Sequence, residues 1–191
     1  MTLHDDVVRQ LTDYDDPDLG QRSIREAFLG FLAARPDATR RSCVPGHITA
    51  SALVIDPSRD AVLLTLHPRV GAWLQLGGHC EDDATLADAA LREAVEESGI
   101  DGLWLDPVLL HLAVHPVTCS LGVPTRHFDV RFLAVAPAGS EPQISSESID
   151  LAWFTRDRLP SPLGSDIGEQ VRRGFARLAM TSGVRRSGTL Q

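Results

Sequence analysis

The chain has 191 residues, of which 43% are hydrophobic and 23% charged, and it carries a formal net charge of −8 at pH 7. This size and apolar fraction suffice for one globular domain with extensions and do not indicate a second full domain. Proteins that bind nucleic acid non-specifically need a basic surface against the phosphates, so the acidic balance argues against nucleic acid and leaves small-molecule partners.

The N-terminus lacks the basic and apolar regions of a secretory signal, and no run approaches 18 apolar residues. We therefore expect a cytoplasmic protein without a membrane segment. Cys43, Cys80 and Cys119 are odd in number and far apart, which favours free thiols over disulfides or a structural zinc site.

Residues 1–45 form a polar, helix-like extension in which 5–11 and 19–34 are helix candidates. The second candidate has apolar residues at helical spacing and ends before Pro36. We expect the extension either to cover the core or to contact a second copy of the chain in a homodimer. A lid over the substrate is a less favoured alternative.

Two strand candidates follow at 47–55 and 61–66, and the turn formers of 56–60 between them predict a hairpin. Trp73 then precedes a glycine pair, Gly77–Gly78, and we expect its side chain to anchor the core.

A helix over residues 86–98 is predicted from its two ends. Thr85 and Asp88 resemble a capping box at the start, and Gly99 supplies the left-handed residue that commonly ends a helix. The loop before this helix contains Glu81 and Cys80, and we expect the Cys80 thiol to be packed and unreactive.

Three glutamates, Glu93, Glu96 and Glu97, fall within about 100° of one another on this helix. The side chains expected on the opposite, core-facing side are Ala87, Leu91, Ala94, Val95 and Ser98. Carboxylates on one face repel each other, and late in a helix they also oppose the macrodipole. A hard cation such as Mg²⁺ removes this conflict, since it binds carboxylate and phosphate oxygens. The pattern therefore predicts phosphate chemistry.

Beyond the helix, 108–117, 127–135 and 151–154 are strand candidates, and a closing helix is expected between 165 and 178. The last residues, 181–191, have the composition of a flexible tail. Strands on both sides of a single site helix predict an α/β fold with a mixed sheet between helices.

Residues 78–100 resemble the signature of the Nudix hydrolases, G-x5-E-x7-R-E-U-x-E-E-x-G-U, where U is aliphatic. The matching positions are Gly78, Arg92, Glu93, Ala94, Glu96, Glu97, Gly99 and Ile100. Ala84 stands where the signature has its first Glu. Asp88, four residues before Arg92, is placed to pair with it instead, while Asp82 or Asp83 serves the entrance of the helix. The resemblance implies a Nudix alpha/beta/alpha sandwich over 46–180.

The resemblance also implies an activity, the metal-dependent hydrolysis of a diphosphate linkage in a nucleoside diphosphate linked to another moiety. Glu93, Glu96 and Glu97 then supply ligands to Mg²⁺ or Mn²⁺, and Arg92 orients a glutamate. Gly77, Gly78 and Glu81 form the phosphate loop. The implied catalytic residues are Arg92, Glu96, Glu97 and a general base in a later acidic segment, for which Glu147 is the first choice and Glu141 and Asp150 are alternatives.

The substrate is left open by the sequence. Pro116 stands 16 residues beyond Ile100, as in the ADP-ribose pyrophosphatases of the family, so ADP-ribose-like compounds and nucleotide sugars come first. The alternative is a catalytically weak Nudix-fold module that binds nucleotides or regulates. The intact glutamate pairs favour an enzyme, and an isopentenyl-diphosphate isomerase is disfavoured because its cysteine motif is absent.

Four histidines are candidate zinc ligands: His79, His111, His115 and His127. None has the H-E-x-x-H spacing, so we expect strand or rim residues and no zinc site. The chain also lacks the G-x-S-x-G elbow of serine hydrolases and the P-loop motif.

Overall fold

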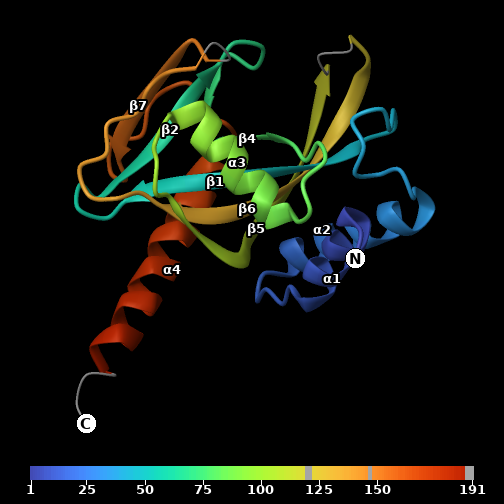
Figure 1. Cartoon of the computed structure of the whole chain (residues 1–191), viewed down its shortest axis with the longest axis horizontal. Helices are drawn as coiled ribbons and strands as arrows, with labels where there is room; N and C mark the ends of the chain where they lie inside the picture. Colours follow the sequence, from blue (N-terminus) through green and yellow to red (C-terminus); the bar gives the residue numbers. More distant parts are fainter. Residues whose placement is uncertain (119–121, 146–147, 188–191) are drawn as a thin grey trace.

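The computed structural model describes residues 1–118, 122–145 and 148–187, with 182–187 by their backbone alone. Seven strands form one sheet in the order β3-β2-β1-β6-β5, with β4 paired to β1 and β7 to β2 (Figure 1). Their bounds are β1 His47–Asp56, β2 Ala61–His67, β3 Ala72–Leu74, β4 Leu76–His79, β5 Trp104–Thr118, β6 Pro124–Val135 and β7 Asp150–Thr155. The sheet is mixed because β1 and β6 run parallel while their other neighbours are antiparallel.

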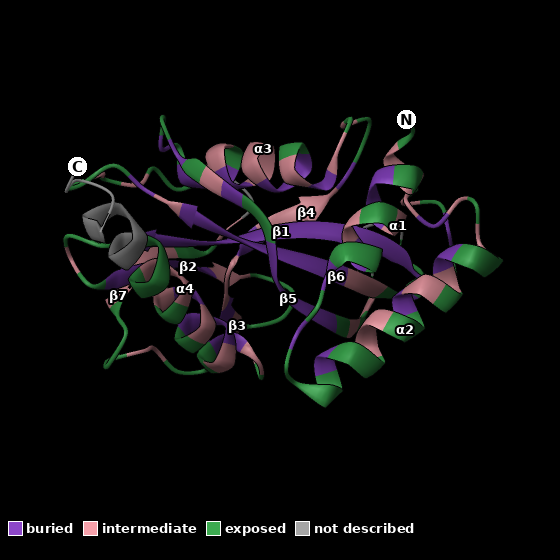
Figure 2. Ribbon diagram, turned by 90° about the horizontal axis from the view of Figure 1, so that it is seen from below, coloured by how far each residue is buried: buried purple, intermediate pink, exposed green. Residues whose placement is uncertain are grey.

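The described part of the chain has four helices around the sheet: α1 Leu3–Asp13, α2 Leu19–Ala34, α3 Leu86–Ser98 and α4 Ile167–Ser187. Figure 2 shows α3 on one face and α4 on the other, with the buried strands between them. The alternation along β1 explains this arrangement, since Ala52 and Val54 pack with α3 whereas Leu53 and Ile55 pack with α4. The predicted alpha/beta/alpha sandwich is confirmed. Among the described residues, no helix has both the length and the apolar character that crossing a bilayer requires.

Two elements are longer than predicted. Helix α4 continues to Ser187, beyond the expected end at 178, because no proline interrupts the chain there. Strand β5 begins at Trp104, and its pairing with β6 shifts register between Asp106 and His111. This irregularity contains Pro107, which an edge strand tolerates. Of the expected tail, residues 181–187 belong to α4, and residues 188–191 lie outside the described residues.

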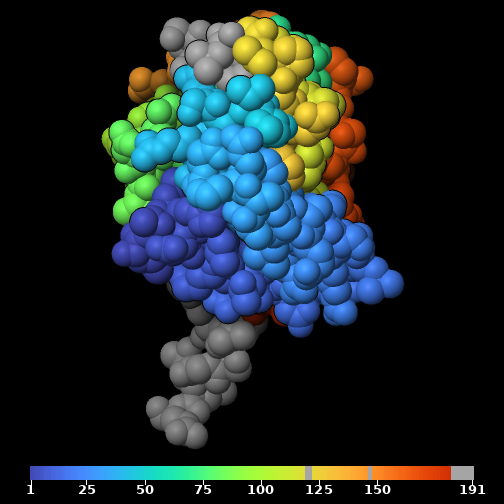
Figure 3. All heavy atoms as spheres, turned by 90° about the vertical axis from the view of Figure 1, so that its right-hand side faces the viewer, coloured from blue at the N-terminus to red at the C-terminus, as the bar shows by residue number. Residues whose placement is uncertain are grey.

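The N-terminal extension lies against the core. Val7, Leu11 and Phe28 belong to the same buried cluster as Leu86 and Ala89 of α3. In the space-filling view of Figure 3, the blue helices α1 and α2 occupy the lower part of the face and adjoin the rest of the molecule. The expectation that the extension covers the core is confirmed, while a homodimer contact stays a prediction.

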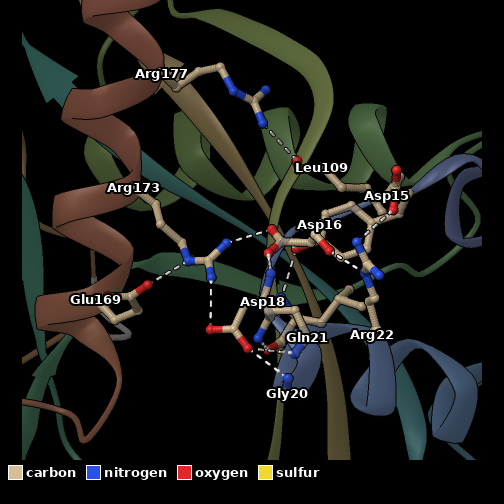
Figure 4. A network of polar contacts seen from close by, with 12 residues as sticks. Asp15, Asp16, Asp18, Gly20, Gln21, Arg22, Leu109, Glu169, Arg173 and Arg177 are labelled. Atoms are coloured by element: carbon tan, nitrogen blue, oxygen red, sulfur yellow. Dashed lines mark hydrogen bonds and ion pairs between the residues drawn. The ribbon is translucent and has the colours of Figure 1, made fainter.

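Polar contacts join the α1–α2 connection to α4 and to the sheet edge (Figure 4). Arg173 of α4 pairs with Asp16 at 2.6 Å. The amide of Gln21 donates to the carbonyl of Leu112 at 3.0 Å and accepts from its N–H at 2.8 Å. Gln21 therefore pairs with the edge strand β5 as a neighbouring strand would.

Candidate active site

The glycine pair of β4 brings the backbone close to two other elements. Gly77 has φ 151°, and a Cβ there would lie 2.3 Å from the Cβ of Ser51 on β1. A Cβ on Gly78 would lie 2.7 Å from Oε2 of Glu93. Both positions therefore require glycine, the first for the strand behind it and the second to admit a carboxylate.

Helix α3 is fixed at both ends as the sequence predicts. The N-cap Thr85 accepts from the Asp88 N–H at 3.1 Å and donates to the Asp88 carboxylate at 2.7 Å. Gly99 is left-handed, with φ 63°, and its N–H donates to the carbonyl of Val95. A third cap comes from the extension, where the buried Asp6 accepts from the Leu86 N–H at 2.9 Å.

The three glutamates lie at different depths. Glu97 is only 9% exposed, and its Oε2 accepts from the Gly77 N–H at 3.1 Å. The Glu93 carboxylate lies against Gly78, and the Glu96 side chain is 59% exposed. The expected separation of a core face from a carboxylate face is wrong for Glu97. The glycine pair leaves room between β4 and the helix, and Glu97 fills part of that room.

Arg92 connects these groups. Its guanidinium donates to Glu93 at 3.0 Å, to Glu96 at 2.9 Å and to the carbonyl of His79 at 2.9 Å. It also donates to Asp83 through both Nε and Nη2, at 3.1 and 2.9 Å. The hydrogen bonds to Asp83, together with the charge of Glu93, raise the pKa of Arg92 above its ordinary value.

The expected pair between Asp88 and Arg92 is wrong. Asp88 is engaged at the N-cap with Thr85, and the loop instead brings Asp83 to Arg92. Asp83 directly precedes Ala84, the position that lacks the signature's Glu. The sequence did show an acid, Asp83, beside Ala84. Which acid reaches Arg92 depends on the path of the loop, which the sequence does not specify.

Among the described residues, no hydrogen bond or ion pair joins Glu81, Glu141 or Asp150 to this cluster. Glu81 is exposed, with a left-handed φ of 45°. Glu141 pairs with Arg59 at 2.6 Å, and Asp150 accepts from its neighbour's N–H at 2.8 Å. Glu147, the first choice for a general base, lies outside the described residues.

The opposite face of the sheet carries a polar centre that sequence reasoning missed. Buried Asp129 on β6 accepts from Thr49, Ser51, Gln75 and Arg131 at 2.7–3.1 Å. Burial alone raises the pKa of Asp129, but Arg131 and the hydrogen bonds outweigh it and hold the pKa below its usual value. These polar residues alternate with core residues along their strands. Any half-buried strand shows the same alternation, so the sequence did not single them out.

Histidines also gather on this face. His47, His79 and His127 have ring centroids 4.9–5.3 Å apart, although the sequence did not single out His47. Burial lowers the pKa of His79 to about 3 and that of His127 to about 4, so both are neutral at pH 7. His111 lies outside this trio, opposite Arg131 on β6, and burial beside Arg131 lowers its pKa to about 4.

The glutamate cluster suits a hard divalent cation. The carboxylates of Asp83, Glu93 and Glu96 pair with the guanidinium of Arg92, and Glu97 adds a fourth carboxylate beside Gly77. Together these five groups carry a formal charge of −3. Carboxylate oxygens are the donors that Mg²⁺ and Mn²⁺ prefer, and Glu97 and Glu93 are held in place by the chain itself. The residues present therefore fit the predicted metal.

Cysteines contribute nothing to this chemistry among the described residues. Cys43 and Cys80 are buried free thiols, and Cys119 lies outside the described residues. Burial raises the pKa of Cys80 well above its ordinary value, as expected for a packed, unreactive thiol. Trp73 is buried against Phe154, which confirms its predicted role as a core anchor.

The chain is similar to several known proteins. The family model described as NUDIX domain matches residues 45–174. The human m7GpppN-mRNA hydrolase NUDT17 is 32% identical over 137 residues, which are 63% of this chain and 42% of that protein. The chain thus spans about two-fifths of the length of this relative.

Solved structures show the same fold. A NUDIX-family hydrolase from Clostridium perfringens has a TM-score of 0.52 at 24% identity, covering 69% of this chain and 97% of that one. The dihydroneopterin triphosphate pyrophosphohydrolase of E. coli has a TM-score of 0.54 at 19% identity, covering 66% and 92%.

Proposed function

The chain belongs to the Nudix family, and from this premise we propose that it is a metal-dependent pyrophosphohydrolase. It cleaves a diphosphate linkage in a nucleoside diphosphate linked to another moiety. The observation that carries the proposal is the placement of Glu93 and Glu97 against the glycine pair, with Arg92 bonded to Glu93 and Glu96.

Each residue of the cluster has a distinct task in this proposal. Glu93, Glu96 and Glu97 hold Mg²⁺ or Mn²⁺, which neutralises phosphate charge and lowers the pKa of a bound water. Arg92 fixes the orientation of Glu93 and Glu96, and Asp83 fixes Arg92. The Gly77 N–H fixes Glu97. Such preorganisation spares the site the cost of ordering these side chains during the reaction.

Phosphorus chemistry also needs a group that accepts the proton of the attacking water. We retain Glu147 as the proposed general base, with Glu141 and Asp150 as alternatives. Glu81 in the phosphate loop is a further polar group near the entrance of α3. Replacing Glu147 by Gln should lower the rate less than replacing a metal ligand, because water can still be activated at the metal.

For the substrate, ADP-ribose and nucleotide sugars are the first compounds to test, since the acidic chain favours small molecules over long nucleic acids. The name of the human relative adds m7GpppN-capped RNA as a second arm. Because the chain spans only part of that protein, capped RNA is included in the test but is not the favoured substrate.

The test measures phosphate release from this panel with Mg²⁺ or Mn²⁺, before and after chelation. Glu96→Gln and Glu97→Gln should each lower the rate at least a hundredfold, or about 2.7 kcal/mol of transition-state stabilisation. Glu26→Gln, an exposed acid on α2, is the matched control and should behave as wild type. Activity that survives chelation, or near wild-type rates in both α3 variants, would refute the proposal.

A second candidate is a nucleotide-binding or regulatory module of the same fold. The observation in its favour is Ala84, which removes an acid of the signature. Saturable nucleotide binding without turnover of any panel compound would select this reading. Cytoplasmic location and homodimer formation stay predictions in either case.

A further inference from the structure

Three histidines from three strands meet on the sheet face opposite α3. The parallel register of β1 and β6 places His47 beside His127, and β4 places His79 beside Thr49, the next residue of β1 on that face. One ring nitrogen from each histidine lies within 4.8 Å of the other two. These residues are separate from the glutamates, which face β4 from α3.

Two of the three rings have a buried nitrogen that makes no hydrogen bond to the described residues. Nε2 of His47 and Nε2 of His127 are shielded from solvent and make no hydrogen bond within the described part of the chain. The His47 ring is 1% exposed. A buried polar atom without a hydrogen bond destabilises the fold, so two of them on neighbouring rings require an explanation.

The tautomer of His47 explains why its Nε2 has no hydrogen bond. Its Nδ1 lies 3.3 Å from the carbonyl oxygen of Cys43, an acceptor, so Nδ1 carries the proton. In the neutral ring, Nε2 then has a free lone pair. Histidines that bind metals commonly donate the other ring N–H to a backbone carbonyl, which fixes the ring and its tautomer in this way.

We propose that His47, His79 and His127 form a second metal site, which takes a divalent transition metal of the zinc class. Imidazole nitrogen suits Zn²⁺, Co²⁺, Ni²⁺ and Cu²⁺, whereas Mg²⁺ prefers oxygen. Three histidines leave a fourth position for water or another ligand. Its ligands are distinct from the glutamates to which we assign hydrolysis.

Distances and charges set what binding requires. Zn–N bonds of about 2.0–2.1 Å place tetrahedral ligand nitrogens about 3.4 Å apart. The ring nitrogens, now within 4.8 Å of one another, must therefore approach each other by on the order of 1 Å. Arg41 lies near His47 and His79 and opposes a cation, while Asp129 lies near His127 and favours one. A bound ion would also fix His79, whose carbonyl holds Arg92 at 2.9 Å.

The test titrates Zn²⁺ into the untagged, chelator-treated full chain against a chromophoric chelator, with excess Mg²⁺ present to occupy oxygen sites. We expect one equivalent of Zn²⁺ in wild type and at least tenfold weaker binding in His79→Gln and His127→Gln. His111→Gln, a buried histidine outside the trio, and Glu97→Gln should bind within about twofold of wild type.

Folding of each variant is checked by circular dichroism and its unfolding midpoint. Co²⁺ in wild type provides a readout that needs no variant, since four-coordinate binding by nitrogen gives strong visible absorption. The proposal is overturned by a weak, octahedral Co²⁺ spectrum, by wild-type affinity in folded His79→Gln or His127→Gln, or by loss of the zinc equivalent in Glu97→Gln.

Discussion

At the scale of single residues, the partner of Arg92 decides whether the site tolerates Ala84. Asp83 makes two hydrogen bonds to the guanidinium, which Glu93 and Glu96 share on its other side. We therefore expect the carboxylate at 83 to compensate for the one that the signature has at 84. Without it, Arg92 would keep its other partners but lose the contact that holds it toward the loop.

Asp83→Ala should therefore lower the rate by about ten- to a hundredfold, or about 1.4–2.7 kcal/mol in the barrier, with less than about 1 kcal/mol lost in unfolding free energy. Ala84→Glu alone should change the rate less than tenfold, because Arg92 already has its carboxylate. In the Asp83→Ala background, Ala84→Glu should restore activity. Turnover measurements on the four proteins decide this, and an unchanged rate in Asp83→Ala would show that Arg92 needs no such support.

His111 is a residue whose protonation opposes folding. Its pKa is about 4 in the folded protein, against an ordinary value of 6.5, because burial and Arg131 disfavour the charged ring. The unfolded chain thus binds more protons between these values, so stability is fully present above pH 6.5 and is lost as the pH falls toward 4.

Urea unfolding of wild type and His111→Gln at pH 7.5 and 5.5 isolates this contribution. On moving to pH 5.5, wild type should lose about 1.4 kcal/mol more unfolding free energy than the variant, since one pKa unit corresponds to that amount. Equal losses in the two proteins would mean that His111 titrates normally in the folded state.

At the scale of elements, what the sequence predicts well is local. The ends of α3 follow from Thr85, Asp88 and Gly99, all within one turn of the helix boundary. The parallel pairing of His47 with His127 joins residues 80 positions apart and follows from no local pattern. For this reason the glutamates were found from the sequence and the histidine cluster was not.

Glycines in two helices show how packing changes the effect of one substitution. Gly30 in α2 is exposed, and a Cβ there would meet nothing within 4 Å. Gly174 in α4 is buried, and a Cβ would lie 2.8 Å from Leu53 and 3.0 Å from Ile55. Alanine is favoured over glycine in a helix interior, but overpacking a core costs more than this preference returns.

Gly30→Ala should therefore raise the unfolding free energy by about 0.5–1 kcal/mol, and Gly174→Ala should lower it by about 1–3 kcal/mol. Thermal and urea unfolding of both variants measure whether the unfolding free energy rises or falls in each. Stabilisation by Gly174→Ala would indicate that α4 can move away from β1 at little cost.

At the scale of the whole molecule, the N-terminal extension is part of the structure that supports the site. Asp6 caps the first turn of α3, and Asp16 is held by Arg173 of α4. The extension thus contacts helices on both faces of the sheet. The family model begins at residue 45, so this support comes from a segment outside the matched region.

Gln21 is the point where this support can be tested, because its amide pairs with both backbone groups of Leu112 on the edge strand. Gln21→Met keeps much of the side-chain volume but removes both hydrogen bonds to Leu112, leaving a buried N–H and C=O unpaired. It also removes the bond that Gln21 accepts from the Tyr14 hydroxyl, which keeps Asp16 as a partner. Each such group costs about 1–3 kcal/mol, so the variant should lose about 2–6 kcal/mol of unfolding free energy. Its Leu112 amide should also exchange hydrogen faster.

Gln10→Met, which removes an amide bonded to Asp6 on α1, is the control for loss of a glutamine and should cost less than about 1 kcal/mol. A Gln21→Met protein as stable as wild type, with Leu112 still protected, would mean that the extension covers the sheet edge without holding it.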